Sequence, residues 1–148
     1  MKNTIFKTLR DDHEIQRTLA DKLIDTEGKS DERDLIFRKL KHELAIHADA
    51  EERFFYKPLI DADLTQGKSR HGIAEHHEMD ELVEKLEETD MSSPQWLPIA
   101  KELAHKINHH LDEEEHEIFQ LAGKILDTAK QEDLGGAYLE YIAEHRVA

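Results

Sequence analysis

Apolar side chains recur every three or four positions along almost all of the 148-residue chain. This spacing places them on one face of an α-helix, and no stretch shows the every-second-residue alternation of a half-buried β-strand. Each helix therefore carries an apolar stripe that another helix must cover. The pattern predicts four long helices and a shorter C-terminal one, over about residues 4–26, 30–58, 68–89, 94–129 and 132–146.

Local signals indicate where these helices begin and end. Ser30 is a favourable N-cap before an acidic first turn. Pro58 predicts a break or a kink at the end of the second helix. The clearest start signal is Ser92-Ser93-Pro94, because a serine cap is followed by a proline that fits the first helical position.

The two halves of the sequence repeat each other. A shift of 63 positions carries His13 onto His76 and His47 onto His110 without a gap. Each half is then one copy of a helical hairpin that cannot bury its apolar face alone. Other matched pairs are Glu51 with Glu114, Glu52 with Glu115, His42 with His105, Leu19 with Leu82, Leu23 with Leu86, Ile36 with Ile99 and Leu40 with Leu103.

From this repeat we expect an all-α fold in which the two hairpins pack about a pseudo-twofold axis. The predicted architecture is an up-down-up-down four-helix bundle over about residues 4–129, followed by a short C-terminal helix over about 132–146. The length of the chain fits a single domain over residues 1–148.

The charge and the residue content exclude several classes of protein. Acidic residues outnumber basic ones by 34 to 20, which gives a net charge of −14, so we expect neither nucleic acid nor an anionic membrane as a partner. The chain contains no cysteine, which excludes a disulfide framework, a cysteine zinc site, an iron–sulfur cluster and a thiol nucleophile. No apolar run approaches the length of a membrane span, so we expect a cytoplasmic protein.

The chain holds 11 histidines, more than a helical core needs. Six of them have an acidic residue four positions later, but most such pairs are expected to be solvated neighbours on a helix surface. Position on an apolar stripe is the more informative criterion. His13, His47, His76 and His110 lie on a stripe, and His77 lies on a flank. The other histidines fall among charged residues and are expected in solvent: His42, His71, His105, His109, His116 and His145.

Two glutamates, Glu51 and Glu114, share the stripes of the second and fourth helices, each four residues after a stripe histidine. Measured from the predicted helix ends, the four histidines lie about 20 Å or 24 Å along their helices, at about 1.5 Å per residue. Antiparallel neighbours bring them to one height. We therefore expect four imidazoles and two carboxylates to converge inside the bundle.

Buried carboxylates need a compensating charge, because an ionised carboxylate without a partner costs at least several kcal/mol. Imidazole with carboxylate is a ligand mixture that suits iron, manganese or zinc. Two carboxylates across the pseudo-twofold axis would bridge two metals, each also held by two imidazoles. Coordination positions then remain open for an oxo or hydroxo bridge, water or dioxygen. The alternative is a buried histidine–glutamate hydrogen-bond network without metal.

At these residues the chain resembles the hemerythrin-like family of HHE cation-binding bundles, over about residues 5–126. The resemblance implies a centre of two non-heme iron ions that binds dioxygen reversibly or senses oxygen, iron or nitric oxide. The matching segments are Asp12-His13-Glu14, HADAEERFFYKP (47–58), AEHHEMDELVEKL (74–86) and HLDEEEHEIF (110–119). Carried over position by position, the implied ligands are His13, His47, Glu51, His76, His110 and Glu114.

The chain departs from the oxygen-carrying members of that family. They have a further histidine one turn before the third-helix ligand, where this chain has Gly72. Their last bridging carboxylate is an aspartate five residues after its histidine, whereas Glu114 follows His110 by four. Gln120 replaces the usual proline. These differences favour sensory or reactive chemistry over oxygen transport.

A ferritin-like di-iron oxidase is the nearest rival fold. That pattern needs Glu-x-x-His on two different helices. Here Glu102-x-x-His105 and Glu113-x-x-His116 both lie on the fourth helix and outside its stripe.

Three functions are compatible with these residues. The first is a di-iron protein that binds or senses dioxygen, nitric oxide, peroxide or iron status, with a dry wall formed by Leu9, Phe55, Met79 and Ile118. The second is an enzyme that reacts with peroxide or nitric oxide, with the Tyr56 hydroxyl close to the bound species. The third is a zinc-filled or metal-free interaction domain. Its protein partner, or a second copy of the chain, would meet the C-terminal helix at Tyr138, Tyr141 and Ile142.

Overall fold

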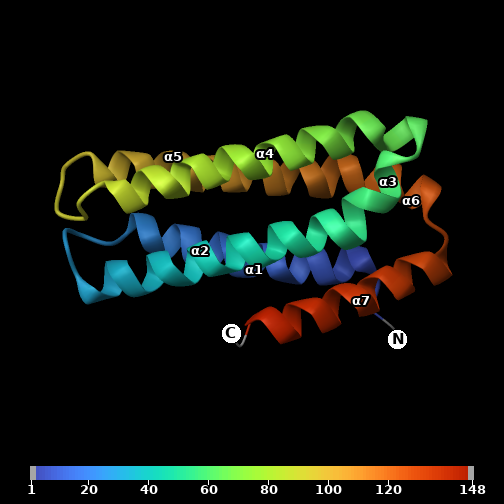
Figure 1. The fold of residues 1–148 in the computed structure, drawn as a ribbon, viewed down its shortest axis with the longest axis horizontal. Coiled ribbons are helices and arrows are strands. Elements are labelled where there is room, and N and C mark those ends of the chain that lie inside the picture. Colours follow the sequence, from blue (N-terminus) through green and yellow to red (C-terminus); the bar gives the residue numbers. More distant parts are fainter. Residues whose placement is uncertain (1–2, 147–148) are drawn as a thin grey trace.

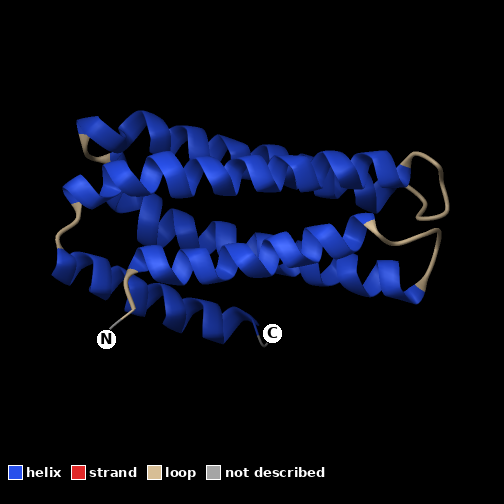
Figure 2. Ribbon diagram, turned by 180° about the vertical axis from the view of Figure 1, so that it is seen from behind, coloured by secondary structure: helices blue, strands red, loops and turns tan. Residues whose placement is uncertain are grey.

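The computed structural model describes residues 3–146, and within this range every regular element is helical (Figure 2). None of the helices in this range is both long and apolar enough to span a bilayer. The elements are α1 (Ile5–Ile24), α2 (Asp31–Glu51), the π-helix η1 (Glu52–Tyr56), α3 (Lys57–Ile60), α4 (Asp63–Glu88), α5 (Trp96–Glu113), the π-helix η2 (Glu114–Ile118), α6 (Phe119–Ile125) and α7 (Thr128–Arg146).

The helices form two long hairpins that pack side by side. The first hairpin is α1 with α2 and the second is α4 with α5, and both hairpin loops lie at the same end of the bundle (Figure 1). The C-terminal helix α7 runs along the outside of the first hairpin, against α1 and α2. The predicted all-α bundle of two hairpins with an added C-terminal helix is confirmed.

The predicted helix starts are correct at Ser30 and wrong at Ser92-Ser93-Pro94. The Ser30 side chain accepts a hydrogen bond from the Arg33 backbone N–H, as an N-cap does. In contrast, α5 begins only at Trp96. Asp90 accepts hydrogen bonds from the backbone and the hydroxyl of Ser92, and these contacts hold the segment in turns instead of releasing it into a helix.

The sequence predicts a break or a kink at Pro58, and the helical path does not break there. A π-helical turn at Glu52–Tyr56 follows α2, and the chain stays helical to Ile60. A second π-turn occupies Glu114–Ile118 in the other hairpin, which has no proline near it. The first π-turn directly follows the inward-facing Glu51, and the second begins at the inward-facing Glu114. Because both turns occur at these glutamates and only one is near a proline, we attribute them to packing around the glutamates and not to Pro58.

The remaining helix bounds differ from the prediction by a few residues. Helix α4 starts at Asp63, five residues early, because the Thr65 hydroxyl bonds the Leu59 carbonyl and closes the corner between α3 and α4. The fourth helical stretch ends at Ile125, and α7 starts at Thr128, so the C-terminal helix is not short but 19 residues long.

The apolar core consists of two clusters with polar residues between them. On each long helix the apolar residues of the first cluster lie toward the hairpin loops, and those of the second cluster lie toward the opposite end. The first cluster includes Leu23, Leu40, Leu86, Trp96, Leu103 and Ile107, and the second includes Ile5, Leu9, Phe55, Leu59, Ile118 and Phe119. His13 falls between Leu9 of the second cluster and Ala20 of the first, for example. The bundle therefore surrounds a polar layer at mid-height with apolar side chains above and below it.

Helix α7 packs on its own bundle through one apolar face. Leu134, Tyr138 and Ile142 are buried in the second apolar cluster. Gly135 lets the helix approach the N-terminal backbone, since a β-carbon there would lie 2.5 Å from the Asn3 carbonyl oxygen. A protein partner for this helix stays a prediction, and Tyr138 and Ile142 are used within the chain.

Two neighbouring glycines of α7 provide a matched test of this packing. Gly136→Ala adds a methyl group to open space, so the gain in helix propensity should raise the free energy of unfolding by about 0.5–1 kcal/mol. Gly135→Ala makes the same change against rigid backbone and should lower it by about 1–3 kcal/mol. Urea unfolding of both variants measures the difference. Equal effects at the two positions would contradict the close contact.

Candidate metal centre

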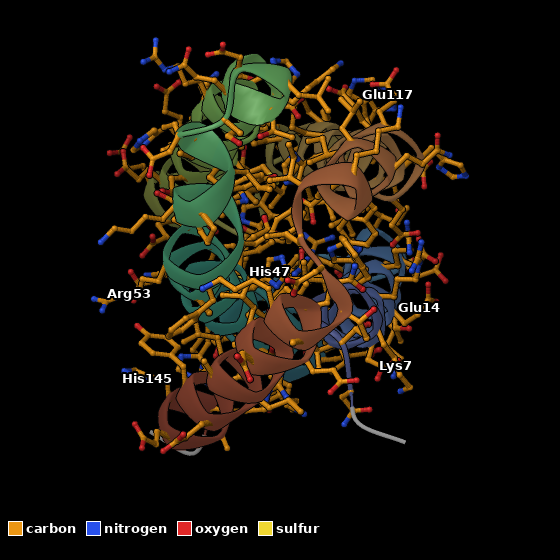
Figure 3. All side chains as sticks on the ribbon, turned by 90° about the vertical axis from the view of Figure 1, so that its right-hand side faces the viewer. Lys7, Glu14, His47, Arg53, Glu117 and His145 are labelled. Carbon is orange, nitrogen blue, oxygen red and sulfur yellow. The ribbon has the colours of Figure 1, made fainter. Side chains whose placement is uncertain are left out.

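The structure brings the six predicted site residues together at the middle of the bundle. They come from α1, α2, α4, α5 and η2, and no side chain among them is more than 4% exposed. In Figure 3 His47 lies in the interior between the helices, whereas the labelled charged residues project outward. The six are His13, His47, Glu51, His76, His110 and Glu114.

Glu51 stands between two pairs of imidazoles. Its Oε2 atom lies 3.3 Å from Nε2 of His47 and 4.0 Å from Nε2 of His13. Its Oε1 atom lies 3.0 Å from Nε2 of His76 and 3.9 Å from Nε2 of His110. One carboxylate oxygen thus faces each pair, as a bridging ligand would require.

Glu114 spans the same gap from the other hairpin. Its Oε1 atom lies 3.1 Å from Nε2 of His13, and its Oε2 atom lies 3.3 Å from Nε2 of His110. Two groups of donor atoms result, His13 with His47, Glu51 and Glu114, and Glu51 with His76 and His110. Donor atoms 3.0–3.3 Å apart leave room for a cation at the usual metal–ligand distance of about 2.0–2.2 Å.

Seven of the eight ligand atoms that face this space lack hydrogen-bond partners. In native proteins buried polar atoms are nearly always paired, so a group of orphans in one place calls for an explanation. Among the described residues the unpaired buried atoms include seven from the site: Nε2 of His13, His47, His76 and His110, both oxygens of Glu51, and Oε1 of Glu114.

The outward ring nitrogens, in contrast, are all satisfied. Nδ1 of His13 contacts Glu115 at 2.5 Å, Nδ1 of His76 contacts Glu52 at 2.9 Å and Nδ1 of His110 contacts Glu75 at 2.9 Å. Nδ1 of His47 lies 2.6 Å from the Tyr138 hydroxyl. An imidazole whose Nδ1–H is held in this way presents the lone pair of Nε2 inward, the tautomer that binds a metal. The four outer partners are Glu52, Glu75, Glu115 and Tyr138.

These four partners were not among the residues predicted for the site. The repeat contains a signal for three of them, because Glu52 corresponds to Glu115 and Glu75 corresponds to Asp12 under the shift of 63 positions. No pattern of that kind could have indicated Tyr138, which lies outside both repeated hairpins.

In the metal-free chain the site is held together by opposite charges. Burial lowers the pKa of His13, but Glu114, Glu115 and Glu51 outweigh it and raise the pKa to about 10. Burial likewise opposes the effect of Glu51 on His47, whose pKa rises to about 9. The pKa of Glu51 is held well below its usual value by the imidazoles, although burial acts in the opposite direction.

Tyr56 fills the place opened by Gly72. The Tyr56 side chain is completely buried, and its hydroxyl donates a short hydrogen bond to Oε2 of Glu114. A β-carbon on Gly72 would lie 3.0 Å from one ring carbon of Tyr56 and closer still to the hydroxyl. Burial and the charge of Glu114 hold the pKa of Tyr56 well above its usual value, so its proton stays in place.

The residues of the rival pattern stay outside the centre. Glu102, His105 and His116 are exposed, and Glu113 contacts His71 and His109 at the surface. The histidines expected in solvent are exposed, apart from the half-buried His145. The four residues predicted to form a dry wall, Leu9, Phe55, Met79 and Ile118, are all buried.

Known proteins give independent information on the fold and the family. A solved structure of a hemerythrin HHE cation binding domain-containing protein from Mycobacterium kansasii has a TM-score of 0.87 and 23% sequence identity to this chain. The match covers 97% of this chain and 88% of that one, and at this identity it shows a shared fold. Among curated proteins none matches the chain significantly.

The sequence profile of the hemerythrin HHE cation binding domain matches residues 4–122, which include all six converging side chains. This match covers most of the chain and ends before α7. The chain therefore belongs to the hemerythrin HHE cation-binding family.

Proposed function

We propose that this chain is a non-heme di-iron protein that binds or senses dioxygen or a related small ligand, such as nitric oxide or peroxide. The observation that carries the proposal is the group of unpaired buried atoms, four imidazole nitrogens and three carboxylate oxygens, that face one another inside a dry bundle. These atoms can act as ligands of cations, and a mixture of imidazole and carboxylate ligands suits iron.

The arrangement supports two cations instead of one. His13 and His47 would hold the first, His76 and His110 the second, and each of Glu51 and Glu114 offers one oxygen to either side. Four protein donors per ion leave open positions in the coordination shell, as in sites that bind a further small molecule. Ferrous ions in such a site can supply electrons to dioxygen, nitric oxide or peroxide.

Tyr56 favours sensing or reaction over reversible oxygen transport. Oxygen carriers of the family have an imidazole where this chain has Gly72, and here the neighbouring space holds a phenol. The Tyr56 hydroxyl donates a hydrogen bond to Oε2 of Glu114, the oxygen that faces His110. A buried proton donor at this place also supports the second candidate, an enzyme that reacts with peroxide or nitric oxide.

Metal content tests the proposal most directly. The protein loaded with iron should contain two irons per chain, and His47→Ala or His110→Ala should each reduce this to one or fewer, because each removes a ligand of one ion. His42→Ala and His105→Ala are matched controls, since these histidines are exposed and are related by the same repeat. Metal analysis and the visible absorption spectrum provide the measurement. Zinc alone, or less than one metal per chain, would reject the proposal.

The fall of stability with pH above pH ~6.5 should disappear when metal binds. In the metal-free chain His13 and His47 have pKa values of about 10 and 9, above the ordinary value of about 6.5 in an unfolded chain. Their protonation stabilises the fold fully below pH ~6.5, and this contribution is lost as the pH rises through about 9 to 10. Bound cations require neutral imidazoles, and the imidazoles of the unfolded chain are also neutral above pH ~6.5, so the stability of the loaded protein should stay nearly constant over the same interval.

Denaturant unfolding between pH 6.5 and pH ~9, with and without iron under anaerobic conditions, checks this expectation. Stability should fall with rising pH in the series without iron and stay nearly constant in the series with iron. Parallel slopes would mean that the imidazoles do not give up protons to a cation.

The Tyr56 hydroxyl is tested through its contact with Gly72. Tyr56→Phe should change the rate at which dioxygen oxidises the reduced centre by about tenfold, equivalent to ~1.4 kcal/mol. Gly72→Ala should have the same effect because its methyl group displaces the hydroxyl, and the double variant should resemble either single one. Gly67→Ala, on the same helix with open space around it, is the control. Stopped-flow spectroscopy gives the rates. Additive effects of the two substitutions would show that Tyr56 and Gly72 act independently and would contradict the prediction.

A further inference from the structure

We propose that Tyr138 of the C-terminal helix is a positioning residue for His47, so that α7 forms part of one of the two cation sites. The inference rests on the proposed binding of two cations and identifies a residue outside the part of the chain that the family profile matches. It follows from a difference among the four imidazoles of the centre.

Three of the imidazoles hold a carboxylate directly. His13 pairs with Glu115, His76 with Glu52 and His110 with Glu75, at 2.5–2.9 Å. The repeat relates the first two pairs to each other, since His13 corresponds to His76 and Glu115 to Glu52. It also predicts the fourth pair, because His110 with Glu75 corresponds to His47 with Asp12.

The fourth pair does not form as the repeat predicts. Asp12 is one methylene shorter than Glu75, and its Oδ2 atom stays 3.7 Å from Nδ1 of His47. The Tyr138 hydroxyl contacts both atoms, at 2.6 Å from Nδ1 of His47 and 2.5 Å from Oδ2 of Asp12. One residue of α7 thus replaces the direct contact with a relay.

The relay has a defined direction. Nδ1–H of His47 donates to the Tyr138 oxygen, and the Tyr138 hydroxyl donates to Asp12. Arg146, at the end of the same helix, donates to Asp12 at 2.9 Å and to Glu43 of α2 at 2.8 Å and 2.9 Å. Tyr138 is 0% exposed and Asp12 is 6% exposed, so water does not compete for these bonds.

Two consequences follow from this geometry. The phenol fixes the tautomer of His47 only while α7 is docked, so cation binding and helix docking stabilise each other, and this coupling is reciprocal. A neutral phenol also raises the basicity of its imidazole less than a carboxylate does, so the ion held by His13 and His47 differs from its neighbour.

Titration of the metal-free, full-length protein with cobalt(II) tests the proposal, because its visible absorption reports each site. Tyr138→Phe keeps the ring and removes the hydroxyl, and it should weaken one of the two cobalt sites by about 10- to 100-fold while leaving the other unchanged. Tyr141→Phe is the control, since Tyr141 lies on the same helix but its hydroxyl contacts Asp49 outside the centre.

A rescue variant separates positioning from packing. In Asp12→Glu combined with Tyr138→Phe, the longer carboxylate should reach Nδ1 of His47 as Glu75 reaches His110, and the affinity of the weakened site should recover. A purely structural role of Tyr138 would not be rescued in this way. Unchanged cobalt affinity in Tyr138→Phe would overturn the inference and leave the proposed function intact.

Hydrogen exchange gives a second measurement, which is made first on the unmodified chain. Backbone amides of α7 should exchange more slowly with cobalt bound than without it, and this difference should vanish in Tyr138→Phe. Identical exchange with and without bound cobalt would contradict the coupling. Failure of the unmodified chain to bind any cation would reject the proposed function together with the inference.

Discussion

Two carboxylates buried at the middle of a helical bundle impose the main constraint on this structure. Glu51 and Glu114 are both 0% exposed, and an ionised carboxylate without a partner in such surroundings costs several kcal/mol or more. Four imidazoles surround them and compensate their charge in the metal-free chain, where proton binding raises stability. Bound cations would replace those protons at the same atoms. The two apolar clusters on either side exclude water and so strengthen every one of these interactions.

The repeat accounts for most of the centre, and tyrosines account for its asymmetry. Each hairpin contributes two imidazoles, one glutamate that faces imidazoles of both hairpins, and outer carboxylates at equivalent positions. Under the same shift Tyr56 corresponds to Phe119 and Gly72 to Leu9, so a phenol replaces an apolar ring on one side only. Tyr138 breaks the symmetry on the other side, next to His47. A duplicated hairpin alone would offer two equivalent groups of donor side chains, whereas the two groups in this chain have different surroundings.

The sequence predicts the convergence of the six side chains because apolar stripes and a repeat of 63 positions are properties of the chain itself. The sequence does not predict the two π-turns, because the extra residue in each turn depends on packing around the site and not on local helix propensity. The predicted start of α5 was wrong for a related reason, namely that Asp90 accepts hydrogen bonds from Ser92 and holds the segment before Trp96 in turns. The outer partner Tyr138 depends on how α7 packs against the bundle, and neither the apolar stripes nor the repeat specifies this.

The length of one side chain connects the C-terminal helix to the chemistry of the centre. If residue 12 were a glutamate, the repeat would close all four imidazole–carboxylate pairs within residues 4–122, and α7 would only cover the bundle. With Asp12 at that position the two atoms stay 3.7 Å apart, too far for a direct hydrogen bond. The Tyr138 hydroxyl bridges them, and Arg146 holds the carboxylate from the end of the same helix. The outer shell of His47 is therefore complete only when the chain is folded as far as residue 146.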